Sequence, residues 1–353
     1  MNVDWNWIKQ RPHFIAEGLC DYFQVTVLYK YHYNRKGYQK RNNTFVHGKK
    51  VFPVYAIPRI DRYAHLKWIN ILLLKWVILF FCFKDKPDFL FLTHPRQVIY
   101  IPFFFRGKVI YDCMDAHSYF VENEKQNNKL LKEEKLLCDK ANYIFTSSEY
   151  LKDYINQKYQ ITKKVFIIRN AYNSKMDVKS KVKMTKLEVG RNIVYFGTIS
   201  DWFDYNLICE STKEIKINYY LFGPISTKNS FPKNDNIFFE GTLEHNELAE
   251  RSKEADALIM PFVVDEKIKA VDPVKLYEYI NLDKCIISVW YPELVIFEPF
   301  VYFYKTYEEY KNLIFYLDKI DFPKKYSEEQ KIAFLKENSW EKRCERIKHI
   351  LGE

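Results

Sequence analysis

The stretch 256–288 restricts the fold of this chain more than any other segment. It contains a short apolar run, a polar loop, a helical pattern over 272–280 and a second apolar run. This order is typical of a β-loop-α-β unit in a parallel sheet. Asp272 can cap the first turn of the helix, and Pro273 suits the first helical position because no N–H is needed there. We therefore expect this helix to begin at the carboxyl edge of a sheet, where open α/β folds bind ligands.

Two side chains of the predicted helix indicate a kind of ligand. Lys275 lies in the first turn and Glu278 lies one turn later, so both occupy roughly the same face. A helix N-terminus favours an anion. The pattern therefore places a cation for phosphate beside a carboxylate for sugar hydroxyls.

The rest of the chain repeats the same alternation of strands and helices. A length of 353 residues is too much for one ordinary core. The fold class we predict is α/β, with two Rossmann-like parallel-sheet domains that face a central cleft. The helical pattern from Pro12 should follow a strand, so the first strand is shortened or missing and the true N-terminus can lie upstream. The predicted divisions are an N-terminal domain at 1–175, a Lys-rich linker at 176–190, a C-terminal domain at 191–338 and a final helix at 339–353 that can pack back on the first domain.

Charge and cysteine content narrow the partners and the compartment. Residues 1–110 carry 18 Lys and Arg against 6 Asp and Glu, a surplus of 12, whereas the whole chain has a net charge of +10. Such a basic surface suits anionic lipid or an acidic acceptor. Nucleic acid is not expected, because no helix-turn-helix, zinc-finger or RNP-type pattern is present. Seven scattered cysteines without a Cys-x-x-Cys pair, and no signal peptide, predict a cytoplasmic protein.

Two segments of the N-terminal part leave alternatives open. The segment 66–83 is the most hydrophobic, but Lys67, Asn70 and Lys75 interrupt it, and a bilayer span needs about 20 apolar residues. It can be a helix that covers a sheet or a helix that lies on a membrane surface. The basic loop 31–50 is either solvated or in contact with an anionic membrane or acceptor.

Several motifs in chain order match a known family. The chain resembles GT-B glycosyltransferases close to glycosyltransferase family 4, especially the branch that includes teichuronic acid biosynthesis glycosyltransferases. The segments that carry the resemblance are Trp5 followed by Gln10-Arg11-Pro12, Tyr111-Asp112 with Asp115, Arg169-Asn170 with Ala171 in place of the usual Gly, the strand containing Gly197, and Pro261-Phe262 followed by 272–279. They span nearly the whole chain.

The resemblance implies transfer of a sugar from a nucleotide-sugar donor to a glycan or lipid-linked acceptor. It also implies a retaining hexosyltransferase of envelope or extracellular polysaccharide synthesis, peripheral at the inner membrane face, with no obligatory metal and no other cofactor. The resemblance and the chemistry of the residues together give these candidates: Gly197, Thr198, Gly223, Lys275 and Glu278 for the donor, His94 and Asp115 for catalysis, and Arg11, Asp112 and Asn170 for the acceptor or cleft.

The residue types agree with that chemistry. Gly197 lets the backbone approach a pyrophosphate, and Lys275 supplies charge for the leaving phosphate. His94 follows a predicted strand, and Asp115 can position or deprotonate an acceptor hydroxyl. Each residue also has a structural alternative: Asp112 can cap a turn, and His94 can serve as a loop residue before a proline.

One departure from the family pattern concerns position 270. Many family 4 enzymes carry two Glu residues separated by seven others, and Ala270 replaces the first while Glu278 matches the second. Asp265, Glu266 and Asp272 are alternatives for the missing acid. A GT-B UDP-sugar 2-epimerase and a degenerate, non-catalytic GT-B subunit that binds a partner or a membrane therefore remain as alternatives. A nicotinamide-linked dehydrogenase is disfavoured, because no Gly-x-Gly-x-x-Gly follows any strand.

Overall fold

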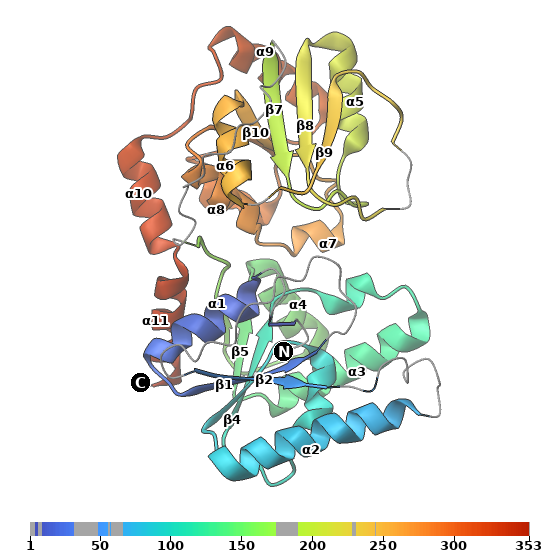
Figure 1. The fold of residues 1–353 in the computed structure, drawn as a ribbon, viewed down its shortest axis with the longest axis vertical. Coiled ribbons are helices and arrows are strands. Elements are labelled where there is room, and N and C mark those ends of the chain that lie inside the picture. Colours follow the sequence, from blue (N-terminus) through green and yellow to red (C-terminus); the bar gives the residue numbers. More distant parts are fainter. Residues whose placement is uncertain are drawn as a thin grey trace. The chain divides into compact units, whose positions relative to one another are not determined.

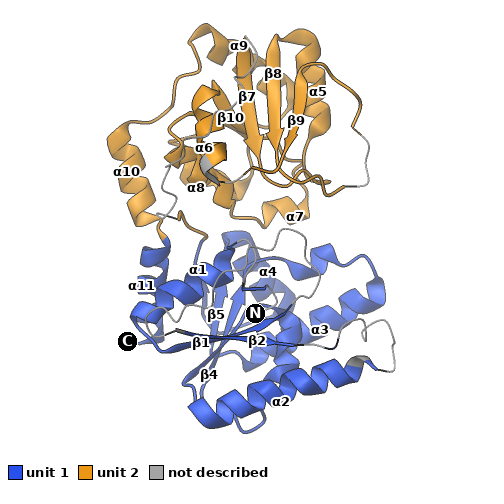
Figure 2. Ribbon diagram, in the orientation of Figure 1, with its two compact units in different colours: residues 1–169, 340–353 blue, residues 170–339 orange. Residues whose placement is uncertain are grey.

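The chain forms two compact units (Figure 2). Unit 1 comprises residues 1–169 and 340–353, and unit 2 comprises residues 170–339. The computed structural model describes residues 4–5, 9–31, 49–55, 57, 66–173, 190–227, 231–243 and 245–352. Most of the basic loop 31–50 and of the expected linker 176–190 lies outside these ranges.

Unit 2 is built on a six-stranded sheet (Figure 1). All neighbouring strands are parallel and run in the order β12-β11-β10-β7-β8-β9. In chain order this is the Rossmann arrangement, in which the direction of winding reverses between the first and fourth strands. That switch point lies between β7 and β10. The strands are β7 (Arg191–Phe196), β8 (Ile217–Phe222), β9 (Ile237–Gly241), β10 (Ala257–Met260), β11 (Cys285–Val289) and β12 (Tyr302–Tyr304).

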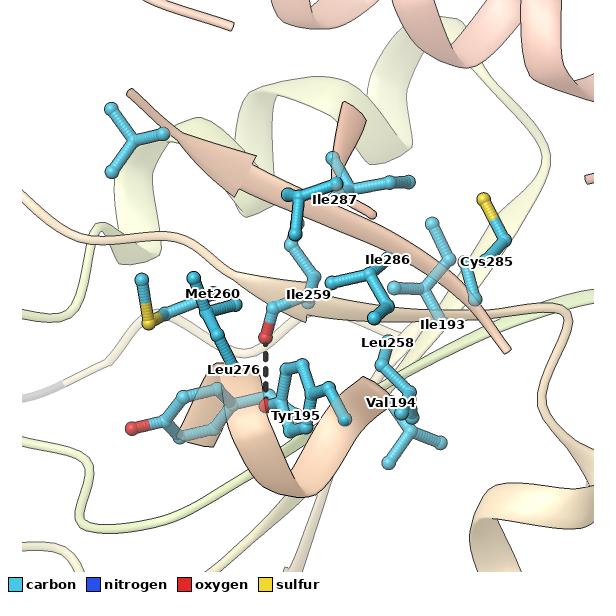
Figure 3. Packing of buried hydrophobic residues seen from close by; sticks show 14 of the residues in the cluster. Ile193, Val194, Tyr195, Leu258, Ile259, Met260, Leu276, Cys285, Ile286 and Ile287 are labelled. Atoms are coloured by element: carbon cyan, nitrogen blue, oxygen red, sulfur yellow. Dashed lines mark hydrogen bonds between the residues drawn. The ribbon is translucent and has the colours of Figure 1, made fainter. Parts of the chain in front are cut away.

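The central strands of this sheet are buried on both faces. Every residue of β8, β10 and β11 is buried, as expected for parallel strands that helices cover on both sides. Figure 3 shows Ile193, Ile259 and Ile287 from three neighbouring strands in one packed layer. The helices are α5 (Tyr205–Glu214), α6 (His245–Glu254), α7 (Glu266–Lys269), α8 (Val274–Asn281), α9 (Tyr307–Lys319) and α10 (Glu328–Glu337), with a 3-10 segment η5 (Pro292–Phe297).

Unit 1 contains two parallel sheets. One pairs β1 with β2, and the other has the order β3-β4-β5-β6. The strands are β1 (Val25–Lys30), β2 (Lys49–Val54), β3 (Phe89–Leu92), β4 (Lys108–Cys113), β5 (Tyr143–Thr146) and β6 (Val165–Ile167). The helices are α1 (Arg11–Gly18), α2 (Lys67–Asp85), α3 (Glu124–Lys140), α4 (Glu149–Tyr159) and α11 (Trp340–Leu351), with 3-10 segments η1 (Leu19–Asp21), η3 (Pro95–Tyr100) and η4 (His117–Phe120).

The last helix, α11, packs against α1 within unit 1. The rings of Phe14 and Trp340 stack at 5.1 Å, and the Cys344 thiol donates to the Ile15 carbonyl at 3.8 Å. A Cβ on Gly18 would lie 2.6 Å from the Cys344 Sγ, so the two helices approach as closely as a glycine allows. The chain therefore returns to unit 1 after it has completed unit 2.

Helix α2 covers the sheet formed by β1 and β2 with one of its faces. The rings of Phe81 and Phe52 lie 4.8 Å apart, and the buried Asn70 side chain exchanges hydrogen bonds of 2.8 and 3.3 Å with the backbone of Ile57. The sheet-covering role predicted for 66–83 is thus present on this inner face. Among the residues that the structure describes, no helix has both the length and the apolar character needed to traverse a bilayer.

Candidate functional site

Two glycines meet at the carboxyl ends of the neighbouring strands β7 and β8. Gly197 directly follows β7 with φ +141°, and Gly223 follows β8 with φ +143°. Residues other than glycine rarely adopt this backbone conformation. A Cβ on Gly223 would overlap the Gly197 carbonyl oxygen and lie 2.6 Å from its carbon. The Gly197 N–H donates to the Phe222 carbonyl at 2.8 Å. These two positions therefore require glycine, and the two loops pass close to one another at the strand ends in what we call the Gly197–Gly223 turn.

The ammonium group of Lys275 lies directly over this turn. A Cβ on Gly197 would overlap Lys275 Cε and lie 2.6 Å from Nζ. Nζ is also 5.9 Å from the ring of Tyr195, which lies in β7, and 6.0 Å from the ring of Phe262, which lies two residues after the end of β10. Burial lowers the pKa of Lys275 below its usual value, while the neighbouring Glu278 opposes that shift. A cation with reduced hydration attracts a phosphate more strongly than a solvated one.

Thr198 and the loop behind it are fixed by backbone contacts. The Thr198 carbonyl accepts the Tyr195 hydroxyl at 2.9 Å, and the Ile199 N–H donates to the Pro224 carbonyl at 3.0 Å. Ser200 Oγ donates to the Ser226 carbonyl at 3.0 Å. The structure therefore brings together Gly197, Gly223, Lys275 and Glu278, with Thr198 next to Gly197 in the chain.

The predicted cap of α8 is wrong. The helix begins at Val274, its N-cap is Pro273, and no side chain caps it. The buried Asp272 carboxylate instead accepts the backbone N–H of Asn170 at 2.5 Å and the Tyr277 hydroxyl at 3.3 Å. Asn170 Nδ2 in turn donates to the Asp272 carbonyl at 2.7 Å. Because the Asp272 carboxylate binds these groups, it does not accept a hydrogen bond from the amides of the first turn of α8.

Each of the three acids considered as alternatives for the one missing at position 270 has a partner elsewhere in the structure. Ala270 is buried and ends α7. Asp265 caps α7 by accepting the Ile268 N–H at 2.9 Å, and Asp272 is held as described above. Glu266 forms a surface ion pair of 2.7 Å with Lys269. Asp265 and Asp272 thus already have structural partners.

A second cluster lies in unit 1, at the carboxyl ends of the neighbouring strands β3 and β4. His94 caps η3: its Nδ1 accepts the Arg96 N–H at 3.1 Å. Burial, the nearby His117 and Arg96 together lower the pKa of His94 to about 3. The ring is therefore neutral at pH 7, and because Nδ1 accepts, its proton lies on Nε2. That nitrogen can donate to a sugar hydroxyl.

His117 is a residue of this cluster that the sequence pattern did not identify. Its ring centroid lies 4.5 Å from that of His94. Within the described ranges, its buried Nε2 has no hydrogen-bond partner. Burial lowers the pKa of His117 to about 4, although a hydrogen bond to the Thr93 backbone and the Asp112 charge oppose the shift. The available signal was its place in Asp115-Ala116-His117, directly after a strand end.

Arg11, Asp112 and Asp115 complete the cluster in unit 1. Arg11 Nε and Nη2 bind both oxygens of Asp112 at 2.7–3.2 Å, and both side chains are almost fully buried. The pair anchors the start of α1 on the end of β4, so the Asp112 carboxylate is held by a buried ion pair with Arg11, where the sequence suggested a turn cap. Burial raises the pKa of Asp115 to about 6, Arg11 opposes the shift and Asp112 adds to it.

Comparison with known proteins identifies the fold. No family model matches the chain, and no curated protein matches it in sequence. Among solved structures, sucrose-phosphate synthase from Thermosynechococcus elongatus has a TM-score of 0.71 at 12% identity, covering 96% of this chain and 91% of that one. HepE from Anabaena, solved in complex with UDP and glucose, has a TM-score of 0.61 at 13% identity, with 87% of each chain covered.

A third similar structure is a trehalose-6-phosphate synthase studied for glycosyltransfer with retention. It has a TM-score of 0.64 at 8% identity and covers 97% of this chain and 96% of that one. The two synthases are GT-B glycosyltransferases, and all three structures match across most of both chains. The predicted α/β fold class is therefore confirmed, whereas the family 4 and teichuronic acid branch remain predictions. The chain has the GT-B fold.

Proposed function

We propose that this protein is a glycosyltransferase that moves a sugar from a UDP-sugar to a glycan or lipid-linked acceptor. The observation that carries the proposal is the ammonium of Lys275 over the Gly197–Gly223 turn, at the carboxyl ends of two strands of a Rossmann-ordered sheet. Backbone at a glycine turn can approach a pyrophosphate closely, and Lys275 can neutralise it. Similar structures that contain UDP favour uridine as the base.

The reaction requires stabilisation of the charge that grows on the leaving diphosphate as the bond to the sugar breaks. Lys275 and the unblocked amides at the start of α8 can provide it without a metal ion. Glu278, one turn into the same helix, would accept ribose hydroxyls, as the family resemblance implies. The neutral His94 ring can donate from Nε2 to a sugar hydroxyl, and Asp115 can accept a proton from an acceptor hydroxyl.

The finer features of the proposal rest on the family resemblance. They are membership of glycosyltransferase family 4 and its teichuronic acid branch, hexosyl transfer with retention, and a role in envelope or extracellular polysaccharide synthesis. They also include a cytoplasmic location at the inner membrane face. Retention is additionally supported by the mechanism studied for the trehalose-6-phosphate synthase with a similar fold.

Binding and turnover measured separately test this function. Calorimetry with UDP, GDP and dTDP should show preferential binding of UDP. Both Lys275→Ala and Glu278→Ala should weaken it, while Lys269→Ala, which alters an exposed lysine of α7, should not. No binding of any nucleotide would contradict the donor site, and unchanged affinity in Glu278→Ala would remove that residue from it.

Release of UDP from UDP-sugars should depend on an added membrane or glycan extract. His94→Ala and Asp115→Asn should lower this turnover while leaving UDP affinity unchanged. Interconversion of UDP-sugars without any acceptor would instead support a 2-epimerase. Tight UDP binding with neither reaction would support a non-catalytic subunit.

A further inference from the structure

Helix α2 exposes an apolar stripe on the face opposite the sheet it covers. Trp76 is 69% exposed and Phe83 77%, and Trp68, Leu72 and Phe80 are exposed as well. At about 3.6 residues per turn, the spacing of these positions places them on one continuous face of the helix. A face with this many exposed large apolar side chains normally has a binding partner.

Basic side chains border this stripe. The same helical spacing places Lys75 on one edge and Lys84 on the other, and Lys84 Nζ lies 5.7 Å from the Phe80 ring. Lysines at the edges of an apolar face can bury their aliphatic stems while their charged ends reach a polar layer. This is the arrangement of a helix that lies in the plane of a membrane surface.

A neighbouring loop extends the apolar surface. Phe103 is 98% exposed, and its ring packs edge-on against that of Phe104 at 5.3 Å. The base of the loop is fixed to the segment that follows α2, because the Lys108 N–H donates to the Asp88 carbonyl at 2.7 Å. A Cβ on Gly107 would lie 2.6 Å from the same oxygen, which keeps the two segments in close contact.

The charge around the stripe decides between possible occupants. Among the side chains that the structure describes on α2 and the adjoining segments, the exposed or half-buried charges near the stripe are the basic residues Lys75, Lys84, Lys86, Arg106 and Lys108 and the acidic residues Asp85 and Asp88. A second copy of the chain would bring an equally basic border against this one, which is unfavourable. An anionic lipid surface supplies both the apolar layer and the complementary charge.

We propose that the outer face of α2, together with Phe103 and Phe104, docks unit 1 on an anionic lipid bilayer. The surface does not cross the membrane; it lies at the level of the headgroups, with aromatic rings inserted and lysines at the phosphates. This proposal rests on the proposed function, in which the acceptor is lipid-linked. Docking on the bilayer would bring such an acceptor within reach of the protein.

Vesicle flotation without nucleotide or acceptor tests the docking surface. The whole protein should float with phosphatidylglycerol-containing vesicles and much less with phosphatidylcholine alone, and tryptophan fluorescence should shift to the blue on binding. The variant Trp76→Ser/Phe80→Ser/Phe83→Ser should bind at least ~100-fold more weakly, since three large apolar side chains no longer insert. Its thermal unfolding should match that of the wild type, because these side chains are exposed.

Two matched variants complete the test. Tyr316→Ser/Ile332→Ser removes two apolar side chains of unit 2 that are 55% and 58% exposed, and it should bind vesicles like the wild type. Lys75→Gln/Lys84→Gln should bind anionic vesicles roughly 30-fold more weakly. Absence of vesicle binding, or equal loss in the Tyr316/Ile332 control, would overturn the proposal. A dimer that depends on Trp76, in place of vesicle binding, would assign the stripe to a second copy. UDP binding is measured separately, so failure of docking leaves the donor site untouched.

Discussion

Gly197→Ala tests whether Gly197 and Lys275 act as one phosphate-binding unit. The new Cβ would overlap Lys275 Cε and lie 2.6 Å from Nζ, so the ammonium must leave its place over the turn. Because the side chain of Lys275 is flexible, it can move aside without unfolding unit 2. The φ of +141° adds backbone strain of roughly 1–3 kcal/mol to the folded state.

The expected loss of UDP affinity follows from the contact that is removed. A hydrogen bond to a charged group contributes about 1.5–3 kcal/mol. Its loss should weaken UDP binding by roughly 10- to 150-fold, and Lys275→Ala should cause a similar loss. Since both changes remove the same ammonium from the site, the double variant should bind no more weakly than Lys275→Ala alone.

Isothermal titration with UDP on the wild type, both single variants and the double variant closes this cycle. Gly190→Ala is the matched control, because Gly190 has φ +129° at the opposite end of β7 and its nearest neighbour would lie 3.8 Å from a new Cβ. It should cause backbone strain with UDP affinity unchanged. Additive losses in the double variant, or normal UDP binding by Gly197→Ala, would refute the coupling of the two residues.

Three further predictions concern stability. Gly223→Ala should lower the free energy of unfolding by about 1–3 kcal/mol more than Gly190→Ala, because its Cβ meets the Gly197 backbone, which cannot rotate away; equal losses in urea unfolding would argue against this. Arg11→Ala should lower the free energy of unfolding by about 3–5 kcal/mol, because it leaves Asp112 buried without its main ion-pair partner. The double variant Arg11→Met/Asp112→Leu should recover part of this loss, and thermal and urea unfolding measure both changes. Because the pKa of Asp115 is raised from 3.8 to about 6, its protonated form stabilises the fold, so unfolding free energy should fall relative to Asp115→Asn as pH rises from about 4 to about 6; parallel profiles would contradict the raised pKa.

The strands of both units could be predicted where they are continuous apolar runs. The apolar run 143–146 coincides with β5, and the apolar runs that end at Phe196 and Phe222 end together with β7 and β8. Buried parallel strands have this character because helices cover both faces. Strand β2 was missed, since it starts with two lysines and contains Pro53, a residue confined mostly to edge strands. Among the strands that the structure describes, β2 pairs with β1.

Side-chain partners were harder to predict than backbone positions. Asp272 before Pro273 matched a helix cap in sequence, yet its carboxylate binds Asn170, which lies 102 positions earlier. Local pattern cannot reveal a competitor that the fold brings from so far away. His117 was missed for the same reason, because its importance comes from the approach of His94 across two strands. Glycines that directly follow an apolar strand were more informative, since the local backbone conformation alone requires a glycine there.

In the proposed donor site, nucleotide binding depends on backbone conformation, whereas sugar chemistry depends on individual side chains. The Gly197–Gly223 turn depends on backbone conformation and on close contact between main chains, so almost any substitution there would disturb the fold. Position 270, by contrast, is the end of a short helix where an alanine packs without disturbing the backbone. An acid can therefore be lost at position 270 while the turn and Lys275 persist. We infer that UDP affinity and sugar transfer are separable here, so turnover with an acceptor is the measurement that distinguishes an enzyme from a non-catalytic relative.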